Sequence, residues 1–234
     1  MSTSNEHIVQ SYNAEQQRLT DEIVRMGEMA AAQLEAALDV VERRDDKAAA
    51  RIVANDEAID ALEQEVSHDV MKLALRGPLA TDLRIILSSI RIASDIERIG
   101  DYAANVAKRT HALNLAPALP HALGLRTLGA LALRQVRDAM TTYRTLDPAA
   151  ALQVRDRDAE LDAQYTALFR ELLTYMMEDA HSITPCTHLL FMAKNLERIG
   201  DHATNIAENI WFRVNGDAPL PPRDKRDGTI DPAP

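Results

Sequence analysis

The sequence predicts an all-α protein made of two tandem, pseudo-symmetric antiparallel three-helix bundles. Apolar residues recur at the spacing of an amphipathic helix through most of the 234 residues. Aromatic residues make up only 4% of the chain, and Ala and Leu, which lose little side-chain freedom in a helix, are abundant. Two acidic motifs also return in the same order about 100 residues later, which indicates duplication of one helical unit.

The helical spacing divides the chain into six predicted helices, at about residues 12–43, 47–75, 80–112, 121–145, 149–178 and 184–213. Pro78 begins the third helix after the Arg76-Gly77 break, and Pro148 separates the fourth helix from the fifth. Pro185 falls in the first turn of the sixth helix, where the missing amide hydrogen costs nothing.

The six helices form two units of three. We expect the first unit at residues 1–114, a linker at 115–120 and the second unit at 121–214. Residues 215–234 hold five prolines and many charges without helical periodicity, so we predict a disordered tail there.

The most informative feature is the internal repeat. The segment Glu97–Asp101, with the sequence Glu-Arg-Ile-Gly-Asp, recurs as Glu197–Asp201 at an offset of 100 residues. On the preceding helix of each unit, Asp56 and Asp60 correspond to Asp158 and Asp162, at an offset of 102. Two motifs that return in order, on the second and third helices of each half, predict that both halves share one architecture.

The repeated acids are candidate metal ligands because residues four apart project from one helix face, about 6 Å from each other. Each acidic pair borders the predicted apolar face, so the carboxylates of two helices converge if those helices pack side by side. The candidate ligands are Asp56, Asp60, Glu97 and Asp101 in the first half and Asp158, Asp162, Glu197 and Asp201 in the second. Asn105 and Asn205, one turn further on, either add an amide oxygen or hydrogen-bond across helices.

The donor set indicates which metals to expect. Oxygen ligands without cysteine or an ordered histidine set suit Mg²⁺, Mn²⁺, Ca²⁺ or iron better than structural Zn²⁺. We therefore expect divalent or trivalent metal ions, with iron, Mn, Mg and Zn as the candidates.

Two kinds of residue next to the acids allow two interpretations each. Arg98 and Arg198 either close salt bridges or meet an anion, and Gly100 and Gly200 mark either a close approach of another group or a tight helix crossing.

Two other interpretations compete with a carboxylate metal centre. In the first, the chain is a metal-free helical adaptor whose acidic faces are solvated or bind basic surfaces of partners. In the second, it is a ferritin-like di-iron protein that uses the pairs Glu65/His68 and Glu178/His181. These pairs do not occupy equivalent positions in the two halves, and a di-iron centre requires them to face each other.

Composition excludes several classes of function. A net charge of −10 repels a phosphate backbone, so we expect no nucleic-acid partner. Cys186 is the only cysteine, which excludes an intrachain disulfide and a CxxC zinc or redox site. No signal peptide and no apolar run of 18 residues are visible, so we expect a cytoplasmic protein without membrane insertion. No catalytic triad, Walker loop or GxGxxG motif is present, and we expect no enzyme.

With these motifs the sequence resembles the PhoU family, the accessory regulators of bacterial phosphate uptake. The resemblance extends from the N-terminus to about Gly216. It depends on Pro78–Arg84 (Pro-Leu-Ala-Thr-Asp-Leu-Arg), on the two Glu-Arg-Ile-Gly-Asp segments, and on the two Asp-xxx-Asp pairs, which match the family's E(D)xxxD motifs.

The resemblance implies two three-helix bundles side by side, with multinuclear metal clusters, often of iron, held by the eight acids named above. It also implies regulation rather than catalysis, through contacts with a phosphate ABC transporter ATPase and a sensor histidine kinase. The regulator would keep the phosphate-starvation response off when phosphate is plentiful. We further expect a homodimer.

The sequence departs from a symmetric duplication in two places. Thr184–Leu190 replaces the Asp-Leu-Arg signature in the sixth helix, so the two halves are expected to contact different groups. Lys108 corresponds to Glu208, one turn past the asparagines, which suggests two sites of unequal charge.

Overall fold

The computed structural model describes residues 2–76, 80–115 and 122–222, and within these ranges it contains helices and no strand. The elements are α1 (Ser2–Arg43), α2 (Asp46–Asn55), α3 (Glu57–Ala74), α4 (Ala80–Asn114), α5 (Ala122–Thr145), α6 (Pro148–Asp156), α7 (Asp158–Glu178), the 3₁₀-helix η1 (Ala180–Ser182) and α8 (Ile183–Asn215). The all-α prediction is confirmed. Pro78 and residues 116–120 of the predicted linker lie outside the described residues.

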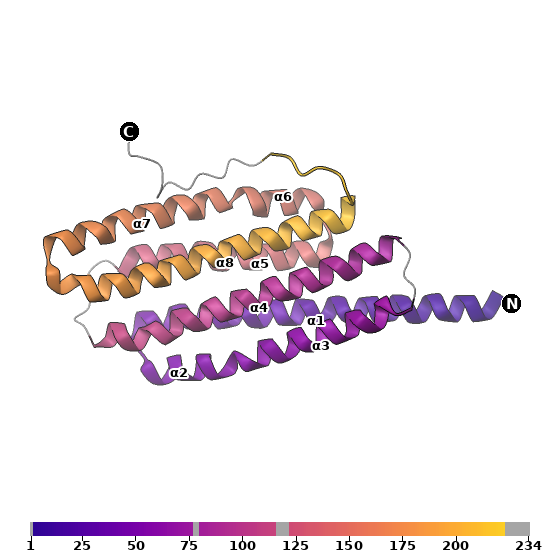
Figure 1. The fold of residues 1–234 in the computed structure, drawn as a ribbon, viewed down its shortest axis with the longest axis horizontal. Helices are drawn as coiled ribbons and strands as arrows, with labels where there is room; N and C mark the ends of the chain where they lie inside the picture. Colours follow the sequence, from indigo (N-terminus) through magenta and orange to yellow (C-terminus); the bar gives the residue numbers. More distant parts are fainter. Residues whose placement is uncertain (1, 77–79, 116–121, 223–234) are drawn as a thin grey trace.

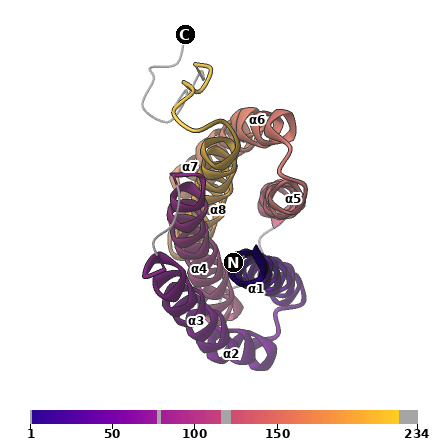
Figure 2. The same cartoon turned by 90° about the vertical axis from the view of Figure 1, so that its right-hand side faces the viewer.

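The helices run roughly side by side in an elongated molecule (Figure 1). The first half consists of α1, α4 and the pair α2–α3, and the second half consists of α5, α8 and the pair α6–α7. The long helices α1, α4, α5 and α8 lie between the two broken pairs, and contacts of α4 with α8 and of α1 with α5 join the halves (Figures 1 and 2).

The turn after the first helix of each half is the same in both repeats. Asp45 accepts hydrogen bonds from the first amides of α2, and Asp147 does the same for α6, so each caps a helix N-terminus. The preceding residues, Arg44 and Leu146, have the positive φ angles 57° and 52°. These positions differ by 102 residues, so the duplication extends to an unusual backbone conformation.

The second helix of each half is broken, which corrects the sequence prediction. We predicted continuous helices at 47–75 and 149–178, but the structure ends α2 at Asn55 and α6 at Asp156 before α3 and α7 begin. The linking residues Asp56 and Arg157 keep right-handed helical angles, with φ of −59° and −68°. Hydrophobic periodicity therefore continues across each break, and periodicity alone could not reveal it.

A buried glutamine on the first helix holds each break. In the first half, Gln33 donates from Nε2 to Asp56 Oδ1 at 2.6 Å and to the carbonyl of Gly100 at 3.1 Å. In the second half, Gln135 donates to Asp158 Oδ1 at 3.3 Å and to the carbonyl of Gly200 at 3.4 Å. The same amide thus ties the broken helix and the third helix of each half to the first helix.

Gly100 and Gly200 allow this arrangement because they have no side chain. A Cβ on Gly100 would lie 3.2 Å from Asp56 Oδ1 and 3.0 Å from Ile59 Cδ1. A Cβ on Gly200 would lie 3.1 Å from Asp158 Oδ1. Each glycine therefore marks a tight helix crossing at which an aspartate approaches the backbone of the third helix.

The interface between the halves has approximate two-fold symmetry. The helices α4 and α8 are antiparallel, because Asp95 lies beside His202 and Arg109 lies beside His188. Tyr102 and His202 differ by 100 residues, and their ring centroids lie only 5.6 Å apart. Two equivalent residues that touch each other must lie near the axis that relates the repeats.

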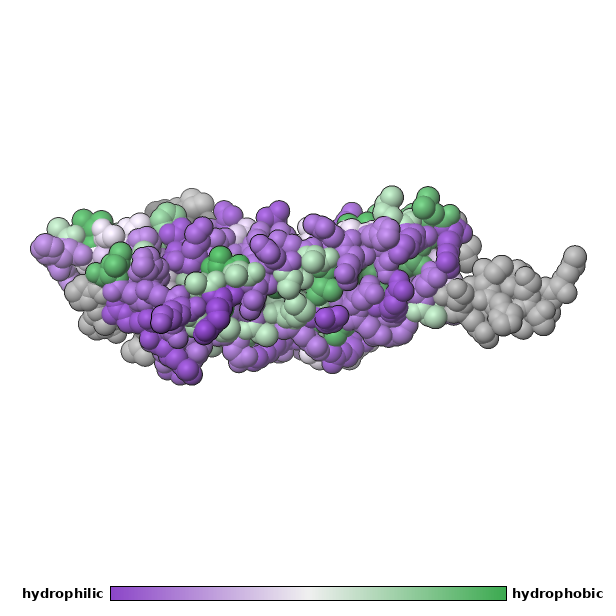
Figure 3. Space-filling model, turned by 90° about the horizontal axis from the view of Figure 1, so that it is seen from below, coloured by the Kyte–Doolittle hydropathy of each residue, from purple (hydrophilic) through white to green (hydrophobic). Residues whose placement is uncertain are grey.

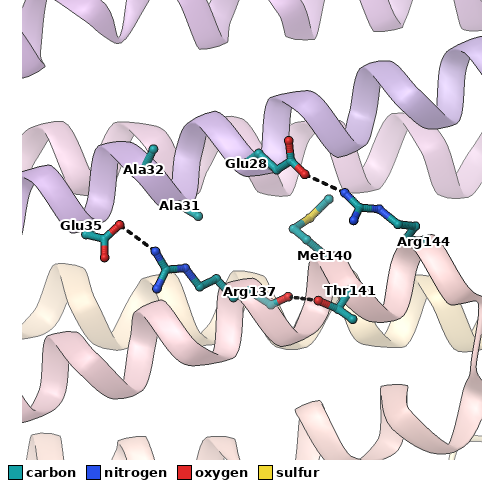
Figure 4. Close-up of a pocket in the computed structure, with 9 residues that line it drawn as sticks. Glu28, Ala31, Ala32, Glu35, Arg137, Met140, Thr141 and Arg144 are labelled. Carbon is teal, nitrogen blue, oxygen red and sulfur yellow. Dashed lines mark hydrogen bonds and ion pairs between the residues drawn. The ribbon is translucent and has the colours of Figure 1, made fainter.

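The contact between α1 and α5 follows the same symmetry. Gly27 faces Met140 and Gly129 faces Leu38, and both members of each pair are related by 102 residues to members of the other. A hollow of about 390 Å³ lies here, and Figure 4 shows two ion pairs at it. These pairs are Glu28–Arg144 at 2.6 Å and Glu35–Arg137 at 2.7 Å.

The surface offers no broad apolar region in the view of Figure 3, where apolar residues form small separate groups on a largely hydrophilic face. Among the described residues, no helix combines the length and the apolarity needed to cross a lipid bilayer.

Residues 216–222 of the predicted tail are described. Their carbonyls at Ala218 and Pro221 accept hydrogen bonds from Trp211 and Arg155, at 3.2 and 2.8 Å. Residues 223–234 lie outside the described part.

The glutamine contacts generate a stability prediction. Gln135→Leu removes the bonds to Asp158 and Gly200 and a third bond to Thr204 Oγ1 at 3.1 Å, all in a buried place. We expect a loss of about 2–4 kcal/mol in the free energy of unfolding, measured by urea denaturation. Gln64→Leu, at an exposed position of α3, serves as the control, and an equal effect of both changes would contradict the role of Gln135.

Candidate metal centre

The first half brings three of the predicted ligands together. Asp60 lies in the first turn of α3, and Glu97 and Asp101 lie one turn apart on α4. One carboxylate oxygen of each lies within 4.8 Å of the others. The break at Asp56 and its bond to Gln33 set the start of α3 against α4, and this position places Asp60 opposite the two acids of α4.

Asp56 lies beside this triad and has a different environment. Its Oδ1 accepts the hydrogen bond of Gln33 and lies against Gly100. Burial raises the pKa of Asp56, and the charges of Asp101 and Asp60 raise it further, whereas the bond from Gln33 lowers it. The ionised form of this carboxylate is therefore disfavoured mainly by burial and further by the other acids.

Glu97 is the most crowded carboxylate of the triad. Its side chain is 21% exposed. Burial raises the pKa of Glu97, and the charge of Asp101 and, more weakly, those of Asp60 and Glu63 add to the increase, while Arg98 lowers it. Glu63 was not among the predicted residues, although its position three residues after Asp60 places it on the same helix face.

One side chain already neutralises part of this charge. Arg98 lies 3.3 Å from Glu97 Oε2 and 2.9 Å from Asp101 Oδ2. Its side chain is 53% exposed, so these ion pairs are screened by water and contribute little to stability. We expected Arg98 either to form salt bridges or to meet an anion, and the structure shows the salt bridges.

The triad has the chemistry of a site for a hard cation. Three carboxylates from two helices offer oxygens only, and an ion that binds oxygen at 2.0–2.6 Å joins oxygens that lie up to about twice that distance apart. A cation held there would relieve the repulsion that adds to the effect of burial on the pKa of Glu97 and Asp56. The chemistry favours Mg²⁺, Mn²⁺, Ca²⁺ or iron over a structural zinc site.

The second half places its acids differently. Asp158 is buried, with 1% exposure, and bonds to Gln135. Asp162, Glu197 and Asp201 do not form a comparable cluster among the described residues. Instead, Glu197 Oε2 lies 2.8 Å from the ammonium of Lys194. We did not predict a role for Lys194, although its spacing of three residues from Glu197 is visible in the sequence.

The two asparagines also differ. Asn205 donates from Nδ2 to Asp95 Oδ1 at 3.3 Å, across the boundary between α8 and α4. This bond is the inter-helix hydrogen bond that was one of the two alternatives for this residue. Asn105 is exposed on α4.

The geometry required by the ferritin-like alternative is not seen. Glu65 and His68 lie on α3, whereas Glu178 ends α7 and His181 lies in η1. The described parts of α3 and α7 do not contact each other, and all four side chains are exposed. The four residues therefore do not meet at shared metals.

Comparison with known proteins identifies the family. A family model described as "PhoU domain" matches twice, at residues 23–110 and 125–210, so each half of the molecule carries one copy. The chain belongs to the PhoU family. The two matched segments correspond to the two three-helix units, and the resemblance drawn from the sequence is confirmed.

Similar PhoU proteins match over nearly their whole length. A "Phosphate-specific transport system accessory protein PhoU homolog" of Xylella fastidiosa (strain 9a5c) is 69% identical and covers 98% of both chains. One of Rhizobium meliloti (strain 1021) is 44% identical and covers 97% of this chain and 96% of its own. The crystal structure of PhoU from Pseudomonas aeruginosa has a TM-score of 0.85 at 32% identity, over 88% of this chain and 99% of that one.

The crowded carboxylates generate a pH-dependent prediction for the metal-free protein. A carboxyl group with a raised pKa binds protons more readily in the folded chain than in the unfolded chain, so its ionised form costs stability as pH rises. Glu97→Gln removes this cost. We expect its melting temperature in EDTA at pH 7.5 to exceed that of the parent by about 1 °C, from relief of like-charge repulsion.

The gain should become smaller as the pH is lowered towards the ordinary pKa of a glutamate, because a growing fraction of Glu97 is then protonated in both folded and unfolded chains. The measurement is a thermal melt followed by circular dichroism from pH 4.5 to 8. Glu65→Gln, at an exposed position of α3, is the control. A lower melting temperature for Glu97→Gln than for the parent at pH 7.5 would contradict the repulsion argument.

Proposed function

We propose that this chain is the accessory protein of a phosphate-specific transport system and that its first half binds a metal cation at Asp60, Glu97 and Asp101. The accessory role is supported by relatives with that name, which are up to 69% identical over 98% of both chains. The cation is supported by three carboxylates whose oxygens lie within 4.8 Å of one another without a histidine or cysteine. That spacing is the single observation on which the metal proposal depends.

The cation would act on structure rather than on a reaction. It would join α3 to α4, because Asp60 lies on one helix and Glu97 and Asp101 lie on the other. Burial and, to a smaller extent, repulsion raise the pKa of Glu97 and Asp56, and binding would remove the repulsion, so the metal-bound half would be more rigid than the metal-free half. A difference of this kind gives a regulator two states that a partner can distinguish.

The regulatory details come from the family resemblance. In this proposal the protein contacts the ATPase of the transporter and a sensor histidine kinase, and it keeps the starvation response off when phosphate is plentiful. It acts without catalysis, as a homodimer. The remaining predicted ligands, Asp56 and the four acids of the second half, stay predictions of the family resemblance and are not part of the site proposed here.

A metal-free adaptor is the second candidate, and one observation favours it. Arg98 bonds to both Glu97 and Asp101, so part of the negative charge is neutralised without an ion. In that case the acidic faces bind basic surfaces of partners directly, and metal content has no bearing on regulation.

Metal content separates the two candidates. We expect Glu97→Gln/Asp101→Asn to lower the metal content of the purified protein at least about tenfold, because affinity for a hard cation depends on the number of charged ligands. The measurement is inductively coupled plasma mass spectrometry after dialysis, with helix content followed by circular dichroism. Glu35→Gln/Asp39→Asn is the matched control, since it changes the same residue types at the same spacing on α1. An unchanged metal content in the first variant would remove the site.

Regulation is tested in cells. In a bacterium that lacks its own copy of the gene, this chain should repress a phosphate-starvation reporter in phosphate-rich medium. The Glu97/Asp101 variant should lose at least half of this repression, whereas the Glu35/Asp39 variant should keep it. Repression by both variants alike would separate the metal from the regulatory role, and absence of repression by the parent chain would contradict the accessory function.

A further inference from the structure

The two halves differ at two positions that border the acidic residues. On the third helix of each half, Ser94 corresponds to Lys194 at the offset of 100. On the broken helix, Glu63 corresponds to Tyr165 at the offset of 102. Compared with the first half, the second half therefore has one more cationic side chain and one fewer carboxylate at the positions that border the acids.

These two replacements contact each other. The ammonium of Lys194 lies 2.8 Å from Glu197 Oε2 and 5.4 Å from the centroid of the Tyr165 ring. The side chain of Glu197 is only 13% exposed. The ammonium therefore forms an ion pair with a shielded carboxylate and a cation–π contact with an aromatic face, and because the Lys194 side chain is 43% exposed, water weakens both contacts.

The arginines do not explain the difference between the halves. Arg98 and Arg198 occupy equivalent positions, so each half has one. Arg98 pairs with the acids of its own half, whereas Arg198 donates to the hydroxyl of Tyr102 at 3.2 Å, on the opposing helix α4. Arg157 replaces Asn55 beside Asp158, but it pairs with Asp138, so Lys194 is the added positive charge that contacts a predicted ligand of the second half.

The balance of charge around the two centres follows from these positions. Five carboxylates and one arginine surround the first centre: Asp56, Asp60, Glu63, Glu97, Asp101 and Arg98. The six equivalent positions of the second half hold four carboxylates, one tyrosine and Arg198, which turns to Tyr102, and Lys194 at the position of Ser94 adds a seventh, charged group. A divalent cation is attracted less to the second set, and it would also have to displace the ammonium from Glu197.

We propose that the ammonium of Lys194 takes the place of a metal ion in the second half. Lys194 and Tyr165 together prevent metal binding in this half, whereas the first half binds metal. This inference goes beyond the proposed function, and it depends on it only for the metal bound by the first half. The molecule then has one half whose packing responds to metal and one half whose packing does not. Lys194 is the residue that determines how many metal centres each chain carries.

The test is a titration of the full chain, freed of metal by a chelator, with Mn²⁺ as the probe. The free ion is counted by its electron paramagnetic resonance signal, which gives the number of tight sites. We expect tight binding in the parent chain that is lost in Glu97→Gln/Asp101→Asn. We expect Lys194→Ser/Tyr165→Glu to add a second set of sites, with affinity at least about 100-fold above that of the second half of the parent.

The reciprocal exchange tests the same inference without changing a predicted ligand. Ser94→Lys/Glu63→Tyr should close the first half, so that tight Mn²⁺ binding is lost while the acids Asp60, Glu97 and Asp101 remain. Lys72→Ser is the matched control, because Lys72 also forms an ion pair at 2.8 Å with an acid three residues away, in this case Asp69. This control should leave the number of sites unchanged.

The outcomes separate this inference from the proposed function. If the parent binds Mn²⁺ and Lys194→Ser/Tyr165→Glu adds no site, or if the parent already binds Mn²⁺ at Asp162 and Glu197, the inference about Lys194 is overturned. If the parent binds none but Lys194→Ser/Tyr165→Glu does, the metal proposal for the first half fails and the inference about Lys194 stands. Should that variant not fold, as judged by circular dichroism, Ser94→Lys/Glu63→Tyr decides: retained binding overturns the inference.

Discussion

The hydrogen bonds from a buried glutamine to an aspartate at a helix break determine the geometry of each half. Gln33 and Gln135 each join three helices, because one side-chain amide reaches both the break and the carbonyl of a glycine on the third helix. Glycine suits this position because a Cβ would lie only about 3.1–3.2 Å from the aspartate oxygen, and the aspartate would have to shift by a few tenths of an ångström. In the first half, the break fixed in this way places Asp60, one turn further on, close to Glu97 and Asp101 of the third helix.

The two halves have the same helix packing but a different arrangement of charged side chains around their acids. In the first half, acids from two helices come within 4.8 Å of one another, and their mutual repulsion and burial raise the pKa of Glu97 and Asp56. In the second half, the ammonium of Lys194 forms an ion pair with Glu197 and lies over the ring of Tyr165. The repulsion that would call for an external ion is therefore greater in the first half. The two halves share the same packing, but the charges around it differ. The interface pair Glu35–Arg137 is another example, because these two residues occupy equivalent positions of the two halves and carry opposite charges.

Much of the fold could be predicted from the sequence, because a helix of period 3.6 and a repeat at offsets of 100 and 102 are both visible in one chain. The breaks at Asp56 and Arg157 could not be predicted in this way, since the backbone stays right-handed and the partner Gln33 lies 23 residues from Asp56 and 67 from Gly100. Spacing along single helices was sufficient to propose Asp60, Glu97 and Asp101. It was not sufficient to find the contact of Lys194 with Tyr165, which depends on how α7 and α8 pack.

The central claim is that the acids of α3 and α4 hold a cation. Anomalous X-ray diffraction from crystals grown with Mn²⁺ tests it most directly, because the signal locates the ion itself. The account predicts a peak within about 2.6 Å of carboxylate oxygens of Asp60, Glu97 and Asp101. It predicts no peak between Asp162 and Glu197, where Lys194 supplies the charge. A crystal with no peak at Asp60, Glu97 and Asp101 would contradict the account.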